Sequence, residues 1–286
     1  MAQTGSCISI REALMKAVPH VDGSTRFDLC IGVDYSGAQT AQAVLPGLQV
    51  YVATVDATKH GVGQAVAVAP PDGRRGWSRQ SIAEWLIAVV ESGKRFLAGI
   101  DHGFSFPDCY FSRYQLRDWD HFLEDFVRHW PTHRPGVTVD DFRKGNASGV
   151  ARTGPNHARR LTECWTSSAK SVFHFDVQGS VAKSTHAGIP WLHELRQRYG
   201  SSLHFWPFDG WEIAEGKSVL AEVYPSIFRN RYPREGRTVD QQDAYATARW
   251  LQTAEQHGFL DRYFSPPLIP AERQLATREG WILGVV

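Results

Sequence analysis

The chain has 286 residues, of which 42% are hydrophobic and 21% charged, a composition typical of folded globular proteins rather than of disordered chains. Its formal net charge is +1, which excludes a strong overall attraction to nucleic acid or anionic membranes, so any such binding must come from a local patch. The four cysteines are scattered and form no CxxC or CxxH pair, which favours free thiols over structural zinc. Because no signal-peptide core and no apolar span of about 20 residues is present, we expect a cytoplasmic protein without membrane association.

The N-terminal part of the chain predicts one helix and three strands. Residues 8–18 have helical spacing of apolar side chains, which predicts a helical extension over residues 1–24. Short runs rich in β-branched and aromatic residues predict strands at 27–34, 48–55 and 64–69. The gaps between these runs are too short for crossover helices, so we expect an antiparallel meander.

An amphipathic helix and a fourth strand follow the meander. Ser78 is the predicted N-cap of a helix over residues 78–92, with Ile82 and Leu86 in its apolar stripe. Residues 96–101, FLAGID, have the pattern of a buried strand. A helix separates this strand from the first one, so the two are expected to lie parallel and side by side through a right-handed crossover.

Regular patterns weaken over residues 104–205, where we expect a large insertion with a helix near residues 119–130 and regular structure again from Trp191. A fifth strand is predicted at residues 218–223, SVLAEV. This strand ends the insertion, which therefore lies between the fourth and fifth strands.

A last long helix is expected over residues 239–257, because Thr238 and Gln241 have the spacing of a capping box. The tail beyond it is expected to pack across the surface. The order of elements predicts an α/β fold with a ribonuclease H-like mixed five-stranded sheet, in the order 3-2-1-4-5, flanked by helices. No repeat or low-complexity linker divides the chain, so residues 25–286 are expected to form one domain.

Carboxylates stand where several of these elements end or begin. Asp34 and Asp101 end the first and fourth strands, which are neighbours in this topology, so both should emerge together at the C-terminal edge of the sheet. Glu222 lies near the end of the fifth strand. Asp240 and Asp243 are three residues apart and therefore share one face of the last helix.

Clustered carboxylates repel one another and raise each other's pKa, so the cluster costs stability unless a cation binds there. Such oxygen ligands suit Mg²⁺ or Mn²⁺, and two such ions about 4 Å apart can drive phosphodiester hydrolysis. We therefore predict catalytic metal ligands at Asp34, Asp101, Glu222 and Asp243, with Asp240 as an additional ligand. The competing interpretation is structural: Asp34 is then a turn residue, Glu222 is the partner of an arginine, and Asp240 is a charge that stabilises the start of the helix.

Four segments contain these carboxylates: GVDYSG (32–37), GIDHGFSFP (99–107), AEVYPS (221–226) and DQQDAYATARWL (240–251). In their order and spacing they resemble the motif blocks of the DUF429 family, a group of uncharacterised prokaryotic proteins predicted to be ribonuclease H-like nucleases. Residues 159–163 and 181–196 are similar to that family's middle region, so the resemblance spans residues 27–253. It implies acidic site residues at the same positions, Asp34, Asp101, Glu222 and Asp243. The D-x-x-D of the last helix also resembles Holliday-junction resolvases of this fold. The glutamate that ribonuclease H carries on its first helix has no equivalent here, so either Glu222 replaces it or the site binds a single metal.

The insertion is more basic than the rest of the chain. Between Arg128 and Arg198, eleven Lys and Arg residues stand against five Asp and Glu. Aromatic residues lie among them and could stack on bases beside cations that bind phosphates. The candidates for stacking are Trp130, Trp165, Phe173 and Phe175, and those for phosphate binding are Arg159, Arg160, Lys170 and Lys183. The alternative is a solvated face above a small core.

The sequence therefore favours a divalent-metal-dependent nuclease with a nucleic acid as its partner. One alternative is a non-catalytic nucleic-acid-binding or scaffold protein of the same fold. Another is an ATP-dependent phosphotransferase, because sugar kinases and actin-like ATPases share this fold, although they use two such domains. The chain has no Walker A loop, no G-x-G-x-x-G and no G-x-S-x-G elbow, which disfavours P-loop or Rossmann nucleotide binding and a serine hydrolase. His102, next to Asp101, is either a proton shuttle or an ordinary hydrogen-bonded histidine.

Overall fold

The computed structural model describes residues 25–55, 63–71, 73–146, 151–166 and 168–286. Seven strands in these ranges form one mixed sheet, in the order β3-β2-β1-β4-β6-β5, with β7 paired to β6. They are β1 (Leu29–Tyr35), β2 (Leu48–Thr54), β3 (Val66–Ala67), β4 (Phe96–Asp101), β5 (Leu203–Trp206), β6 (Ser218–Val223) and β7 (Ile282–Leu283). The helix predicted over residues 8–18 lies outside the described residues.

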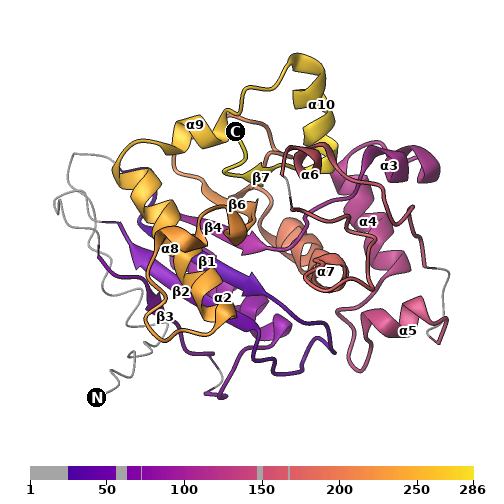
Figure 1. Ribbon diagram of the computed structural model, residues 1–286, viewed down its shortest axis with the longest axis horizontal. Helices are drawn as coiled ribbons and strands as arrows, with labels where there is room; N and C mark the ends of the chain where they lie inside the picture. Colours follow the sequence, from indigo (N-terminus) through magenta and orange to yellow (C-terminus); the bar gives the residue numbers. More distant parts are fainter. Residues whose placement is uncertain (1–24, 56–62, 72, 147–150, 167) are drawn as a thin grey trace.

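Helices cover both faces of this sheet, with α8 in front of β1 and β2 in the view of Figure 1 and α2 behind them. The first half of the chain contributes α2 (Arg79–Glu91), α3 (Asp108–Tyr114), α4 (Trp119–His129) and α5 (Val139–Arg143). The second half contributes α6 (Leu161–Trp165), α7 (Ala182–Tyr199), the 3-10 turns η1 (Pro225–Ile227) and η2 (Arg229–Arg231), α8 (Val239–Gln256), α9 (Leu260–Phe264) and α10 (Pro270–Glu279). The chain is thus of the α/β class.

The five predicted strands are present and lie in the expected order, as β3-β2-β1-β4-β6. β1 pairs antiparallel with β2 and parallel with β4, and β4 pairs parallel with β6. The predicted caps are also found: the Ser78 side chain accepts from the N3 backbone of α2, and Thr238 forms a capping box with Gln241 at the start of α8. The strand predicted at residues 64–69 is reduced to two residues in β3.

The insertion and the tail differ from the expectation. The insertion ends in an additional edge strand, β5, which pairs parallel with β6. Regular structure, expected from Trp191, already begins at Ala182, where α7 starts and continues through Pro190. The expectation that the tail packs across the surface is wrong for its end, because β7 pairs with β6 and Trp281 and Leu283 are fully buried. Short apolar runs of two to four residues carry no periodicity, so these strands depend on tertiary pairing.

Alternate residues of β1 face opposite sides of the sheet. Ile31 and Val33 belong to the hydrophobic core that includes α2, whereas Cys30 belongs to the core that includes α8. Asp34 is four residues from Cys30 and so lies on the α8 face. The face on which a residue lies, set by this odd–even alternation, decides which functional groups can meet at the end of the sheet.

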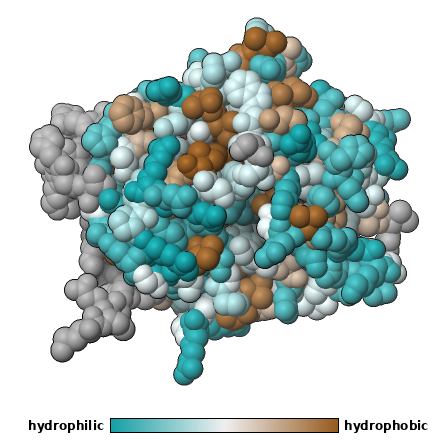
Figure 2. Space-filling view, in the orientation of Figure 1, coloured by the Kyte–Doolittle hydropathy of each residue, from teal (hydrophilic) through white to brown (hydrophobic). Residues whose placement is uncertain are grey.

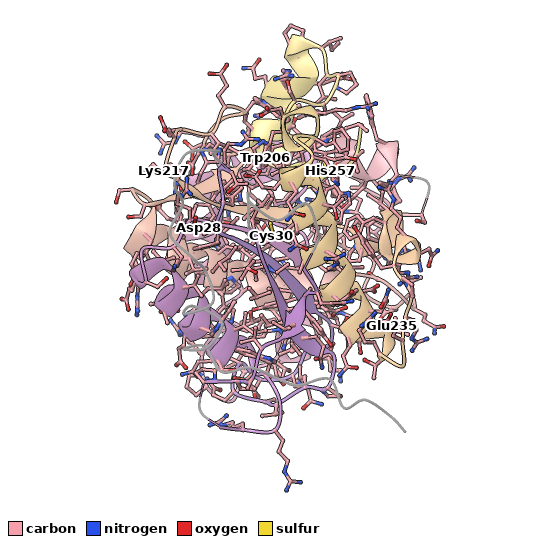
Figure 3. The ribbon with its side chains drawn as sticks, turned by 90° about the vertical axis from the view of Figure 1, so that its left-hand side faces the viewer. Asp28, Cys30, Trp206, Lys217, Glu235 and His257 are labelled. Carbon is pink, nitrogen blue, oxygen red and sulfur yellow. The ribbon has the colours of Figure 1, made fainter. Side chains whose placement is uncertain are left out.

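Helix α8 lies directly against β1. A Cβ atom at Gly32 would stand 2.1 Å from the carbonyl oxygen of Ala244, so only glycine allows the helix to pack this close. In Figure 3, α8 runs from near Glu235, just before its N-terminus, to its C-cap His257. Asp28 lies on the other side of the molecule from Glu235 in this view. Because Asp28 precedes β1, the N-terminus of α8 points to the edge where β1 and β4 end.

Among the described residues, no helix has both the length and the apolar character that crossing a membrane requires. The face shown in Figure 2 is largely hydrophilic, and its hydrophobic residues form separate patches. A ligand on this face would therefore meet mainly polar side chains.

Candidate metal centre

Three carboxylates from three elements meet at the end of the sheet. Asp34 of β1, Asp101 of β4 and Asp243 of α8 offer oxygen atoms that all lie within 4.8 Å of one another. Asp34 and Asp101 are register partners on neighbouring parallel strands, and Asp243 comes over them from the first turns of α8. We refer to these three residues as the Asp cluster.

The turn after β1 fixes the Asp34 carboxylate. The backbone N–H of Ser36 donates to Asp34 Oδ1 at 2.9 Å, and Gly37 follows with a φ of +85°, a conformation that side chains disfavour. The buried Arg79 of α2 donates to the carbonyl oxygen of Gly37. The turn that follows Asp34 is therefore held in place by a buried cation.

Burial first, and then the negative charges of neighbouring carboxylates, raise the pKa values of the Asp cluster. Burial, followed by repulsion from Asp240 and Asp243, raises the pKa of Asp34 to about 7, against the effect of its hydrogen bonds from Ser36. Burial and then the charges of Asp34 and Asp243 raise the pKa of Asp101 well above its ordinary value. The pKa of Asp243 is also raised, first by burial, while Arg229 acts in the opposite direction.

A divalent cation fits this arrangement. Within the described part of the chain, the Asp101 carboxylate has no hydrogen-bond or ion-pair partner, although it lies between two other carboxylates. Such a partly buried, unpaired charge is costly unless a cation compensates it. Carboxylate oxygens are the ligands that Mg²⁺ and Mn²⁺ prefer. The Asp cluster is therefore suited to hold such an ion.

Asp240 lies near the Asp cluster but is not part of it. It lines the same cleft and its charge contributes to the raised pKa of Asp34. Burial raises the pKa of Asp240 itself. Its predicted role as an additional ligand stays open, because its oxygens do not belong to the group of atoms within 4.8 Å.

Glu222 does not join the Asp cluster, contrary to our expectation. In β6, Ala221 and Val223 belong to the core under α8, whereas Leu220 belongs to the core under α2. Glu222 has the parity of Leu220 and so leaves the sheet on the face opposite to Asp101. The predicted ligand set therefore loses Glu222.

Arg160 binds Glu222 instead. Its guanidinium donates to the two Glu222 oxygens at 2.7 and 2.6 Å, and its Nε donates to Glu163 at 2.9 Å. The Arg160 side chain is 1% exposed, so the prediction that it binds a nucleic-acid phosphate is wrong. Burial, the largest single effect, lowers the pKa of the Arg160 guanidinium. The charges and hydrogen bonds of Glu222 and Glu163 together outweigh it, so the pKa is raised above its ordinary value. This buried network ties the insertion to β6.

The Asp cluster opens into a cleft of about 720 Å³. Its walls come from the turn after β1, the segment before α7, η1 and η2, and the start of α8. Of the residues that the structure describes, three cations line it, namely Lys170, Lys183 and Arg229. Acidic and basic groups therefore face the same space.

Two of the predicted phosphate-binding cations thus lie beside the Asp cluster. Lys183 is paired there with Asp140 at 2.7 Å, and Lys170 donates to the carbonyl oxygen of Gln178. Arg159 is exposed but does not line the cleft. Much of the basic excess of the insertion is used in ion pairs, such as the one between Arg152 and Asp125.

The predicted base-stacking aromatic residues are mostly core residues. Trp130 and Phe173 are buried, and both rings contact the buried imidazole of His186. Phe175 is half-buried and also contacts this ring. Trp165 is exposed, and its ring packs edge-on against Trp281. Stacking on bases by Trp130 and Phe173 is therefore excluded in this arrangement.

His102 is an ordinary buried histidine. Its Nδ1 lies 2.9 Å from the carbonyl oxygen of Gly103, and its ring packs against Tyr35. Burial lowers its pKa to about 4. The imidazole is therefore neutral near neutral pH and has no second proton to give up, which favours the structural interpretation.

Sequence reasoning missed Arg229. This residue follows the AEVYPS segment in FRNRYPR, where no spacing links it to the carboxylates. The only available signal was its position a few residues after the end of a strand that reaches the site edge.

No family model matches the chain, and neither a curated protein nor a solved structure matches it. The resemblance to the DUF429 family therefore stays a prediction.

Proposed function

We propose that the chain has a ribonuclease H-like fold of the DUF429 type and is a divalent-metal-dependent nuclease. The observation that carries this proposal is the convergence of Asp34, Asp101 and Asp243 at the C-terminal edge of the sheet, with their oxygens within 4.8 Å. Its support from topology is the strand order β3-β2-β1-β4-β6 with α8 packed on β1.

The residues have distinct roles in this proposal. Asp34 and Asp101, fixed by their register on β1 and β4, would hold Mg²⁺ or Mn²⁺ together with Asp243. When bound, such an ion supplies Lewis-acid activation of a water molecule and of the scissile phosphate. Ser36 keeps one Asp34 oxygen oriented through its backbone N–H, and the rigid sheet limits how far the carboxylates can move apart.

The cleft supports a polyanionic substrate. Lys170, Lys183 and Arg229 line it within the same space as the Asp cluster. Cations of this kind attract the phosphate backbone irrespective of base sequence, and their contribution falls with salt concentration. Because Trp130 and Phe173 of the insertion are buried, few of its aromatic side chains can stack on bases. We therefore expect recognition of the backbone rather than of individual bases.

The test is cleavage by purified protein. Single-stranded, duplex, hybrid and branched nucleic acids would be incubated with Mg²⁺ or Mn²⁺ and with a chelator. Asp34→Asn and Asp101→Asn remove one ligand charge each, and Asp261→Asn, at an exposed carboxylate, is the matched control. We expect cleavage that needs the cation and is lost by at least about 100-fold in the two cluster variants.

Two outcomes would contradict the proposal. Cleavage that survives Asp34→Asn, or that continues in the chelator, would remove the Asp cluster from the chemistry. Salt-dependent binding of nucleic acid without cleavage and without dependence on a cation would instead favour the non-catalytic alternative.

A further inference from the structure

Arg229 has an anchored backbone beside the Asp cluster. Its carbonyl oxygen accepts from Gln242 Nε2 at 3.2 Å, and the same amide donates to Tyr232 O at 2.8 Å. Gln242 precedes Asp243 on α8, so η2 and the Asp cluster are held by the same helical turn. The guanidinium is therefore kept within reach of the cleft while its long side chain remains adjustable.

The contact between Arg229 and Asp243 is an incomplete one. A single nitrogen, Nη1, lies 3.1 Å from Asp243 Oδ2 and 3.4 Å from Oδ1. The other guanidinium nitrogens have no hydrogen-bond partner in the described part of the chain, and the side chain is 38% exposed. Arginine binds carboxylates and phosphates best through two nitrogens in a fork. This end-on contact leaves a fork free for an anion in the cleft.

The other cations of the cleft are held by groups outside the Asp cluster. Lys183 pairs with Asp140, and Lys170 binds a backbone carbonyl. Arg229, in contrast, pairs with a member of the Asp cluster itself. A change at the cluster therefore acts on Arg229 directly.

We propose that Arg229 is a phosphate-binding residue that exchanges between Asp243 and the substrate. In the cation-free protein the guanidinium neutralises part of the charge of Asp243. When the Asp cluster holds a divalent cation, the Asp243 carboxylate binds that cation. The guanidinium of Arg229 is then released and binds oxygens of a substrate phosphate through two of its nitrogens. The inference rests on the metal site of the proposed function.

Removal of Arg229 has two consequences of opposite sign. The Asp cluster gains net negative charge, so a cation should bind about two- to tenfold more tightly, a modest effect because the pair is partly exposed. The phosphate loses a charge-assisted hydrogen bond, so its binding should weaken about 10- to 100-fold. A residue with only a structural role would weaken both.

The experiment compares Arg229→Ala and Arg229→Lys with Arg231→Ala, which removes the same charge from the same 3-10 turn at an exposed position outside the cleft lining. Mn²⁺ binding would be measured by calorimetry and by electron paramagnetic resonance. Binding of a phosphorothioate-linked thymidine dinucleotide, which resists cleavage, would then be measured at saturating Mn²⁺. Circular dichroism and thermal melts would establish that each variant is folded.

We expect tighter Mn²⁺ binding in Arg229→Ala alone, and the largest loss of dinucleotide binding in the same variant. Arg229→Lys should keep the Mn²⁺ affinity close to that of the wild type, because it keeps the charge, but should lose part of the dinucleotide affinity with the fork. The proposal is overturned if Arg229→Ala weakens both ligands, leaves dinucleotide binding unchanged, or behaves like Arg231→Ala. It is also overturned if the wild type binds no Mn²⁺. If the wild type binds Mn²⁺ and the dinucleotide but cleaves no nucleic acid, the proposed nuclease function is contradicted and the proposal for Arg229 still holds.

Discussion

Arg160 and Glu222 form a buried ion pair beneath the end of β4, with both Glu222 oxygens accepting from one guanidinium at 2.6 and 2.7 Å. The same guanidinium binds Glu163, and its Nη1 also contacts the carbonyl oxygen of Glu279 at 3.3 Å. Segments of the insertion, the central sheet and the C-terminal helix therefore meet at one cation. Glu222 is therefore a structural carboxylate, unlike the three carboxylates of the Asp cluster, which are not neutralised in this way.

Glu222→Gln is expected to destabilise the fold without removing the metal site. The substitution leaves Arg160 buried with one fewer negative partner, which should cost about 3 kcal/mol in the free energy of unfolding. Urea unfolding measures this loss, and Mn²⁺ titration of the folded variant should give an affinity close to that of the wild type. A variant of full stability that no longer binds Mn²⁺ would return Glu222 to the ligand set.

Asp34→Asn is expected to stabilise the cation-free protein while abolishing its response to metal. The asparagine keeps an oxygen for the Ser36 N–H but removes a buried charge whose pKa is raised to about 7. At about pH 8 the gain should be on the order of 1–4 kcal/mol. Thermal melts with and without Mn²⁺ measure both effects. Asp240→Asn, at the rim of the cleft, should do less of each, and equal effects of the two variants would contradict the ligand assignment.

The stability of the cation-free protein should depend on pH through Asp34. Its pKa is raised from 3.8 to about 7, so between these pH values the folded protein binds a proton that the unfolded chain releases. The stabilisation is fully present below about pH 4 and is lost as the pH rises through about 7, at up to about 1.4 kcal/mol per pH unit.

In the proposed metal site, a divalent cation competes with that proton for Asp34. The increase in melting temperature caused by Mn²⁺ should therefore be larger at about pH 8 than at about pH 5.5. Asp34→Asn should remove most of this difference. An equal Mn²⁺ response of the wild type at both pH values would show that Asp34 does not hold the ion.

Gly32→Ala is expected to separate α8 from β1. The new Cβ would lie 2.1 Å from the backbone oxygen of Ala244, a contact that no side-chain rotation can relieve. We expect a loss of about 3 kcal/mol and weaker Mn²⁺ binding, because Asp243 moves away with the helix. Chemical unfolding and Mn²⁺ titration measure these effects. At Gly63 a Cβ would make only an ordinary contact of 3.8 Å, so Gly63→Ala is the control, and equal behaviour of the two variants would exclude the packing explanation.

His186 is expected to contribute to acid unfolding. Its imidazole is fully buried among aromatic rings, and burial lowers its pKa from 6.5 to about 3. The unfolded chain therefore binds a proton that the folded protein excludes, so stability is complete above about pH 6.5 and falls as the pH decreases toward 3.

His186→Phe keeps the aromatic packing and removes this proton. Below pH 6.5 the free energy of unfolding should fall less steeply in the variant than in the wild type. The difference between the two slopes should be up to about 1.4 kcal/mol per pH unit. Urea unfolding at several pH values checks the slope. The exposed His157 provides the control His157→Phe, which should leave the slope unchanged. An unaltered slope in His186→Phe would mean that the buried ring is not the titrating group.

The sequence by itself determined the five central strands and all three elements that carry the Asp cluster, namely β1, β4 and α8. Runs that end in Asp34 and Asp101, and the capping box at Thr238, are local signals, because strand pattern and cap chemistry depend on neighbouring residues. The meeting of Asp34, Asp101 and Asp243 also followed from the predicted order of elements.

Tertiary structure decided the remainder. The parity of β6 sends Glu222 to the opposite face, and Arg160 reaches it from a segment 62 residues away in the chain. The same long-range pairing created β5 and β7, buried Trp130 and Phe173, and brought Arg229 to Asp243. Each of these depends on which distant groups share one buried space, and a charge becomes a ligand, a partner or a structural anchor according to the neighbours that compensate it.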